Sequence, residues 1–311
     1  MDTLMNSLQQ PTCRMYRRIA WRAMLMMALG AAAMPTAIAQ APPATNYQGL
    51  WWAAPAGSQP GWGINVAHQG DVIFATWFTY MTRFHLPQWL SMTATKTAEG
   101  EYTGNLVLST GSPYSTVPYS NADFGFLPFV GSATLKFDSP TTGTLIYTPV
   151  TTEIRQPIAL MAFGPLPTCV WGAQPDLSKA TNYTDLWWAS PPGTEAGWGV
   201  NITHQGSVIF ATWFTYDADQ APDWFSVTAN QISPNTYAGT LYRTTGPNWG
   251  VIPFQPSEVT YLEVGAAVFT FFDGNNARFT TSVNVYGGAG ISTQEKNITR
   301  QVFRPPGTVC H

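Results

Sequence analysis

An internal duplication is the feature that most limits what this chain can fold into. Residues 46–80 align without gaps to residues 182–216, an offset of 136, and 24 of these 35 aligned positions are identical. A repeat of this length is too long for the unit of a solenoid and has the size of a small domain. We therefore expect two homologous domains, at 40–169 and 182–311, joined by a short linker at 170–181.

Both copies have the two-residue alternation of β-strands. In the first copy, large side chains alternate with small or polar ones over 62–68, and 71–80 is rich in β-branched and aromatic residues. The dipeptide Gln69-Gly70 between these runs predicts a two-residue hairpin turn. A short strand is expected at 50–52, and further strands are expected at 88–95, 102–109, 132–138, 144–150 and 154–163.

The number and spacing of these strands predict an all-β fold. About eight short strands per copy, joined by successive hairpins, favour two tandem antiparallel β-barrels of the up-and-down type, and a pair of β-sandwiches is the alternative. A barrel of eight strands is either filled by its own side chains or holds one small ligand. The barrel interior is therefore one place where function could lie.

Residues 1–39 have the pattern of a secretory signal peptide. Four arginines precede an apolar run at 23–33, and small residues follow it. The run is shorter than the ~20 residues of a membrane-spanning helix. We expect cleavage after Ala39 or Ala41, with translation starting at Met1 or Met15, and a secreted or periplasmic location in a bacterium.

The charge of the chain argues against nucleic acid as a partner. Only 10% of the residues are charged, against ~25% in typical domains. Without 1–39, 10 basic and 16 acidic residues remain, a net charge of about −6. Such a chain has no basic surface for phosphates, and we expect neither nucleic-acid binding nor stable membrane insertion. The 14% of aromatic residues argues against disorder.

The polar residues that both copies share include no carboxylate. Asp71 aligns with Ser207, and Gln88 aligns with Asp223. A glycosidase needs two placed carboxylates, so this mechanism is disfavoured for both copies, although an enzyme confined to one copy escapes the objection. The dipeptides Arg155-Gln156 and Arg300-Gln301 are taken to be equivalent and to close the two repeats.

His68 and His204 are the sharpest candidates for chemistry. A histidine in this setting can act as a general base or a metal ligand, or it can end a strand and hydrogen-bond across its hairpin. A metal site needs three or four ligands, and the chain has four histidines and none of the usual spacings. We expect no metal and no cofactor.

Five tryptophan positions are duplicated, and they divide by context. Trp77 lies within an apolar strand, which favours a place in the core. Trp62 and Trp198 are flanked by glycines, which allow close approach of a ligand or of another backbone. Aromatic rings beside amides suit sugars or small apolar molecules. The predicted ligand site therefore consists of Trp62, Asn65, His68, Trp198, Asn201 and His204.

Two cysteines remain outside the predicted signal peptide. Cys169 and Cys310 each close one repeat, and an oxidising compartment would let them pair. Two free thiols, or pairing between molecules, is the alternative. We expect the disulfide.

The repeated motif resembles that of a known but uncharacterised group of proteins. Each copy contains WW, then GWGxNxxHQG, then FATWFTY. This pattern resembles the repeat of uncharacterised secreted proteobacterial proteins. The resemblance implies export and tandem all-β domains, and it brings no catalytic residues with it.

The sequence favours a binding function over catalysis. Duplicated aromatic and amide residues without a duplicated acid–base pair predict an exported tandem binding or interaction protein for a small apolar molecule or a glycan. One alternative is a secreted hydrolase or isomerase that uses His68 or His204 with a carboxylate such as Asp71 or Asp223. An outer-membrane barrel is a weaker alternative. The sequence does not determine the oligomeric state.

Overall fold

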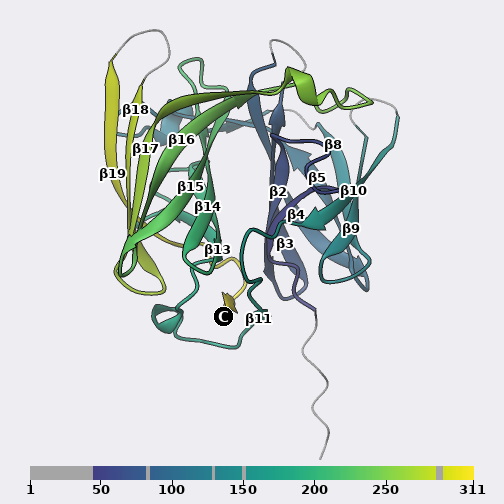
Figure 1. Cartoon of the computed structure of the whole chain (residues 1–311), viewed down its shortest axis with the longest axis horizontal. Coiled ribbons are helices and arrows are strands. Elements are labelled where there is room, and N and C mark those ends of the chain that lie inside the picture. The colour runs from purple at the N-terminus through teal and green to yellow at the C-terminus, as the bar shows by residue number, and fades with distance from the viewer. Residues whose placement is uncertain (1–44, 82–84, 128–129, 149–151, 285–289) are drawn as a thin grey trace, which may run out of the picture. The chain divides into compact units, whose positions relative to one another are not determined.

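The chain folds into two β-barrels that lie side by side (Figure 1). The computed structural model describes residues 45–81, 85–127, 130–148, 152–284 and 290–311. The described residues belong to one compact unit. They contain short 3-10 helices and no α-helix. The predicted signal peptide at 1–39 lies outside the described residues.

Barrel 1 is a closed antiparallel sheet of eight strands in up-and-down order. Its last strand pairs with its first, so that Trp51 lies opposite Leu160. The strands of barrel 1 are β1 (Gly49–Ala53), β2 (Gly63–Gln69), β3 (Val72–Tyr80), β4 (Pro87–Ala98), β5 (Glu101–Val107), β8 (Gly131–Phe137), β9 (Thr142–Tyr147) and β10 (Ile154–Leu160).

Barrel 2 repeats this arrangement, and its last four strands are longer than those of barrel 1. Its strands are β12 (Asp185–Ala189), β13 (Gly199–Gln205), β14 (Val208–Tyr216), β15 (Pro222–Ser233), β16 (Thr236–Thr245), β17 (Thr260–Phe271), β18 (Asn276–Asn284) and β19 (Ile291–Arg300). In barrel 1 the outer ends of the strands that match β16 and β17 form a separate short sheet of β6 (Ser109–Thr110) and β7 (Gly125–Phe126). The prediction of two tandem eight-stranded barrels is confirmed.

The hairpin turn lies one residue later than the sequence predicts. Gln69 still pairs with Val72 in the β2–β3 ladder, so the turn consists of Gly70 and Asp71. Gly70 has a φ of +65°, which a glycine adopts without steric cost. The glycine therefore takes the first turn position rather than the second.

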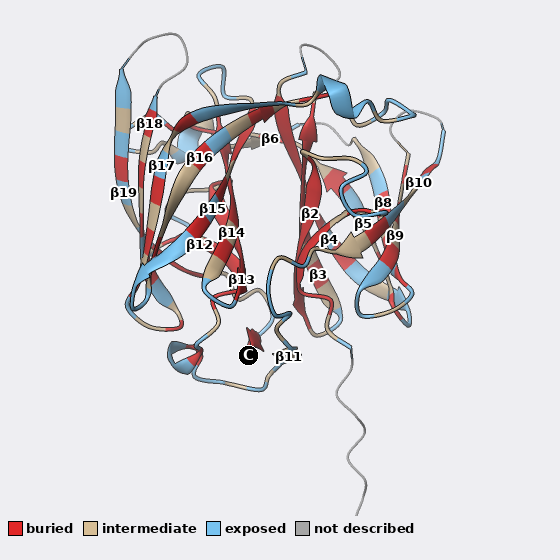
Figure 2. Ribbon diagram, in the orientation of Figure 1, coloured by how far each residue is buried: buried red, intermediate tan, exposed pale blue. Residues whose placement is uncertain are grey.

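Alternation along the strands fills each barrel with its own side chains. Trp51 is fully buried inside barrel 1, whereas its neighbour Trp52 points to the outside and is half-buried. Trp77 and its counterpart Trp213 lie in the two cores, as predicted. The buried residues follow the barrel strands (Figure 2).

The strand register corrects one predicted equivalence between the copies. Leu160 lies opposite Trp51 in barrel 1, and Arg300 lies opposite Trp187 in barrel 2. Arg300 is therefore the counterpart of Leu160, and its match to Arg155 was wrong. The side chain of Arg300 is fully buried, while that of Arg155 is 63% exposed. The shared dipeptide Arg-Gln predicted the wrong alignment of the two last strands, because pairing with the first strand, rather than local sequence identity, sets their register.

The predicted disulfide between Cys169 and Cys310 is confirmed. The two cysteines lie opposite each other in a small sheet formed by β11 (Cys169–Trp171) and β20 (Thr308–Cys310). The bond joins the ends of the two repeats. The predicted linker at 170–181 begins within β11 and contains the 3-10 helix η2 (Leu177–Lys179), and the predicted domain limits stay predictions.

Each barrel is covered at one end by a loop from the other barrel. The loop between β6 and β7 inserts Tyr114 into the core of barrel 2, where its ring lies 5.3 Å from that of Phe225. The loop between β16 and β17, which contains η3 (Pro256–Glu258), crosses to barrel 1 (Figure 1). Its Trp249 lies 5.4 Å from Trp77 and hydrogen-bonds through its carbonyl to Tyr147. We call these two segments the exchanged loops.

Candidate functional site

The imidazole ring of His68 is held by its own repeat. The residue is 3% exposed. Its Nδ1 accepts a hydrogen bond from the backbone N–H of Tyr47 at 3.0 Å, and its Nε2 lies 3.0 Å from the hydroxyl of Tyr102. Because Nδ1 is an acceptor, the neutral ring carries its proton on Nε2. Burial lowers the pKa of His68 to about 4, so the ring is uncharged at neutral pH.

His204 occupies the same place in barrel 2. Its Nδ1 accepts from the backbone N–H of Tyr183, and its Nε2 lies 2.9 Å from the carbonyl of Gly206 and 3.1 Å from the hydroxyl of Tyr237. Burial lowers the pKa of His204 as well. Within the described part of the chain, none of the hydrogen bonds of either histidine ring involves a carboxylate. Both histidines connect a strand end to a tyrosine-lined core.

Asn65 and Asn201 lie between the barrels and hold them together. The side-chain amide of Asn65 donates to Thr212 at 2.7 Å, and that of Asn201 donates to Thr76 at 2.7 Å. The cavity that both asparagines line measures about 10 Å³, which is room for about one water molecule. The predicted role of these amides in binding a ligand stays a prediction, and their observed contacts are those of an interface.

The glycines around Trp62 serve packing against an aromatic ring. Gly61 has a φ of +88°, and a Cβ at this position would lie 2.3 Å from the hydroxyl of Tyr80. Gly197 meets Tyr216 in the same way. Trp62 itself is 7% exposed and donates its indole N–H to Gln59. The repeated Gly-Trp-Gly motif therefore lets the chain pass close to a tyrosine of its own barrel.

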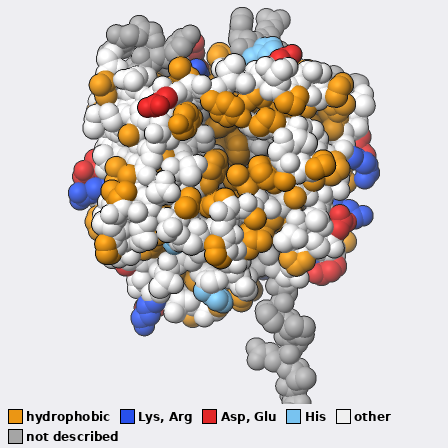
Figure 3. All heavy atoms as spheres, in the orientation of Figure 1, with side chains coloured by type: hydrophobic (Ala, Val, Ile, Leu, Met, Phe, Trp, Pro, Cys, Tyr) orange, Lys and Arg blue, Asp and Glu red, His pale blue; other side chains and the backbone are white. Residues whose placement is uncertain are grey.

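Two equivalent pockets lie along the seam between the barrels. The first seam pocket encloses about 220 Å³ and the second about 310 Å³. Seven pairs of equivalent residues line the two pockets, and the two members of each pair lie in different pockets. The pairs, with the residue of the first seam pocket given first, are Leu50 and Leu186, Trp52 and Trp188, Trp62 and Trp198, Phe78 and Phe214, Phe210 and Phe74, Trp224 and Trp89, and Ser226 and Ser91. On one face of the molecule, hydrophobic side chains surround a hollow between the barrels (Figure 3).

The polar groups of the seam pockets are few and mostly uncharged. The first seam pocket contains Gln59, Ser226 and Thr244. The second contains Thr76, Ser91, Ser109 and Gln301. Its carboxylate, Glu195, is paired with Lys296 at 2.6 Å. An aromatic lining with a few hydroxyl groups can hold an apolar ring or chain. It offers no pair of groups for acid–base catalysis.

The sequence reasoning missed most residues of the seam pockets. It singled out Trp62 and Trp198, which line them, but not Trp52, Phe74 or Phe78. A signal was present, because β3 is apolar on both of its faces, which is typical of a strand buried on both sides. That pattern indicates a packed outer face but does not name the partner.

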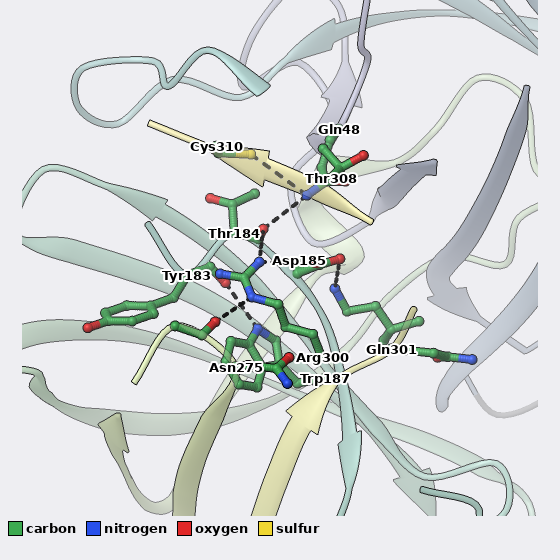
Figure 4. A network of polar contacts seen from close by, with 12 residues as sticks. Gln48, Tyr183, Thr184, Asp185, Trp187, Asn275, Arg300, Gln301, Thr308 and Cys310 are labelled. Atoms are coloured by element: carbon green, nitrogen blue, oxygen red, sulfur yellow. Dashed lines mark hydrogen bonds and ion pairs between the residues drawn. The ribbon is translucent and has the colours of Figure 1, made fainter. Parts of the chain in front are cut away.

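A buried ionic network lies at the end of barrel 2 that faces the disulfide (Figure 4). Arg300 donates to the carboxylate of Asp185 at 3.0 Å and to three backbone carbonyls, and its guanidinium lies 5.1 Å from the ring centre of Trp187. Complete burial raises the pKa of Asp185 to about 6, although the arginine acts to lower it. The network satisfies strand ends and leaves no open face toward a ligand.

Further comparisons add no known relative. Across the described ranges, no three His, Cys, Asp or Glu side chains gather as a metal site would require. No helix in the same ranges is long and apolar enough to cross a membrane. Searches against protein-family models, curated proteins and solved structures find no match.

Proposed function

We propose that this protein is an exported binding protein that holds small apolar molecules in its two seam pockets. The observation that carries the proposal is the duplication of the pockets themselves. Each pocket is built from the outer faces of both barrels, and the same aromatic residues line it twice. Packing alone would be better served by side chains that fill this space, because protein interiors are close-packed.

The chemistry of the lining favours an apolar ligand. The half-buried Trp52 and Trp188 present ring surface at the seam. The volume of the larger pocket is at the lower end of the ~300–1,000 Å³ range of small-molecule sites, which fits a ligand of one or two rings or a short chain. Two linked sites also raise the avidity for a ligand that is presented more than once.

Catalysis finds less support than binding. A hydrolase or isomerase that uses His68 or His204 as a general base needs a partner group that orients the ring and stabilises its protonated form. Both rings instead contact tyrosines and backbone groups. Asp71 is exposed, and Asp223 is buried in an ion pair with Arg243. Catalysis therefore stays a prediction without an observation in its favour.

Two observations support export. The disulfide between Cys169 and Cys310 needs an oxidising compartment, and residues 1–39 have the pattern of a signal peptide. Mass spectrometry of the protein recovered from a periplasmic or culture fraction would test this part of the proposal. A processed N-terminus near 40 supports it, and an intact N-terminus with two free thiols contradicts it.

Titration with the uncharged fluorescent probe N-phenylnaphthylamine tests the binding sites. We expect two probe molecules per chain in the wild type and one in each of the variants Trp52→Ala and Trp188→Ala. Trp171→Ala is the matched control, because this indole is 40% exposed and lines neither seam pocket. Unchanged binding in the folded double variant Trp52→Ala/Trp188→Ala would overturn the proposal.

A further inference from the structure

A third pocket lies at the mouth of barrel 1, and its lining differs from that of the seam pockets. It encloses about 290 Å³ between the barrel and the exchanged loop that carries Trp249. Aromatic rings and polar side chains share this mouth pocket. The rings are Trp62, Trp77, Tyr147, Trp249 and Phe254, and the polar side chains include Gln59, Gln156, Asn248 and Arg155.

The amides of the mouth pocket have hydrogen-bonding capacity left for a ligand. Gln59 donates to Gln156 at 3.0 Å, and Gln156 donates to the carbonyl of Pro157 at 3.0 Å. Each amide has two N–H groups, and in the contacts of the described residues each uses one. The guanidinium of Arg155 is 63% exposed and is paired through Nε with Glu153, so the charge at the rim is balanced.

In barrel 2, an ion pair occupies the position that corresponds to the amides of the mouth pocket. The register that matches Leu160 with Arg300 matches Gln156 with Lys296, and Gln59 aligns with Glu195. The amide pair of barrel 1 is thus an ion pair in barrel 2.

The cation also covers an aromatic surface in barrel 2. Lys296 Nζ lies 5.4 Å from the ring centre of Trp198 and 5.7 Å from that of Tyr119, which belongs to the other exchanged loop. The two rings and the lysine therefore pack together at this mouth. Barrel 1 has no cation in the position of Lys296, and its rings and amides line an open pocket instead.

We infer that the mouth pocket of barrel 1 binds a neutral saccharide. The apolar face of a pyranose ring packs on an aromatic ring, and its hydroxyl groups both donate to and accept from amides. Trp249 and Tyr147, whose rings are stacked at 5.8 Å, supply aromatic surface, and Gln59, Gln156 and Asn248 supply the amides. Apolar ligands would leave these amides unpaired, which costs free energy.

The site depends on both repeats, because Asn248, Trp249 and Phe254 come from the exchanged loop of the second repeat, whereas Gln59, Gln156 and Tyr147 come from the first. A bound sugar would hold the exchanged loop to barrel 1. The inference does not depend on apolar ligands in the seam pockets, since different side chains carry it apart from the shared Gln59 and Trp62.

Calorimetric titration with cellotriose, chitotriose and xylotriose tests the inference on the full chain. We expect at least one of these sugars to bind the wild type with a dissociation constant in the millimolar range or below. The double variant Gln59→Glu/Gln156→Lys transfers the ion pair of barrel 2 to this mouth and should weaken binding by at least about tenfold, or ~1.4 kcal/mol. The matched control Arg278→Gln/Glu295→Gln removes an exposed ion pair of barrel 2 that lines neither the mouth pocket nor the seam pockets, and it should bind as the wild type does.

A second variant guards against misfolding of the first. Asn248→Ala changes a loop residue at the rim and should also weaken binding, while thermal unfolding stays as in the wild type. The inference is overturned if none of the three sugars binds, or if the folded double variant keeps its affinity. Titration of Asn248→Ala with N-phenylnaphthylamine separates this result from the seam pockets, because Asn248 lines neither of them. Loss of sugar binding with two dye sites retained in this variant concerns the mouth alone.

Discussion

The two barrels share a backbone fold but differ in the charged side chains that they bury. Among the described residues, barrel 2 contains three largely buried ion pairs at positions where barrel 1 has uncharged side chains. The pairs are Asp185–Arg300, Asp223–Arg243 and Glu195–Lys296, and their counterparts are Gly49–Leu160, Gln88–Leu108 and Gln59–Gln156.

The comparison teaches that ion pairs do not specify this fold. Both barrels close with the same strand order and inward-facing aromatic residues, although one has buried charges and the other has none at these places. A buried ion pair often contributes little net stability, because desolvation opposes the attraction. What the charges change is the response of each barrel to substitution, to acid and to salt.

The largest expected effect follows from removing one partner of the deepest pair. Arg300→Leu leaves the carboxylate of Asp185 buried without its cation, which should lower the free energy of unfolding by about 3–5 kcal/mol. The double variant Asp185→Gly/Arg300→Leu installs the residues of barrel 1 and should regain most of that loss. Chemical denaturation measures both. A double variant as unstable as Arg300→Leu would show that the pair is needed for this barrel.

Because the loops are exchanged, substituting a core residue in a loop of one repeat should destabilise mainly the other barrel. Tyr114 is 8% exposed within the core of barrel 2, so Tyr114→Ala should cost about 3–4 kcal/mol. Trp249→Ala should cost less, because Trp249 is only partly buried. Amide hydrogen exchange should rise mainly in β13–β15 for Tyr114→Ala. Faster amide hydrogen exchange confined to barrel 1 would contradict the insertion of Tyr114 into barrel 2.

Acid should destabilise barrel 1 relative to barrel 2. His68 has a pKa of about 4 in the folded chain and ~6.5 when unfolded. The folded state therefore binds fewer protons between these values, and stability is lost as the pH falls from about 6.5 toward 4. The loss is at most about 3 kcal/mol.

Barrel 2 contains His204, whose pKa is also lowered by burial, but it has in addition carboxyl groups that act in the opposite direction. Burial raises the pKa of Asp185 and of Asp223 to about 6, so their protonation favours the folded state as the pH falls from about 6 toward 4. Hydrogen exchange of each barrel at pH 7 and pH 5 measures the difference, and His68→Asn should reduce it. Equal changes in both barrels would contradict the assignment.

The smallest effect belongs to the ion pair at the mouth of barrel 2. Glu195 and Lys296 are 17% and 15% exposed, and pairs near a surface contribute about 0.2–1 kcal/mol. Glu195→Gln/Lys296→Gln should lower the melting temperature slightly and remove part of its salt dependence. The same measurement on Gln59→Glu/Gln156→Lys should introduce a salt dependence in barrel 1.

Local patterns predicted the barrels, and long-range contacts escaped prediction. The strands and the disulfide follow from alternation and from cysteines at the repeat ends. The roles of Asn65 and Asn201 could not be predicted in this way. Their threonine partners lie 147 and 125 residues away in the sequence and become neighbours only when the barrels pack.

The exchanged loops could have been found by a closer comparison of the two copies. The segments 110–119 and 245–254 share Thr-Gly at their start and a proline followed by an aromatic residue at their end. Their similarity shows that the loop belongs to the repeat, but it does not show which barrel the loop covers. That choice depends on how the barrels are placed, which no local pattern encodes.

The exchange of loops also sets an order of events in time. The last strand of barrel 1 ends at Leu160, whereas Trp249, which covers its mouth, follows about ninety residues later. If the chain folds while it emerges N-terminus first, a synthesis rate of ~5–20 residues per second would leave barrel 1 with an uncovered aromatic mouth for roughly 5 to 20 seconds. During that interval all strands of barrel 1 would be present, but its aromatic mouth could contact other apolar surfaces. The exposure would end when the second repeat, which carries the covering loop, has been made.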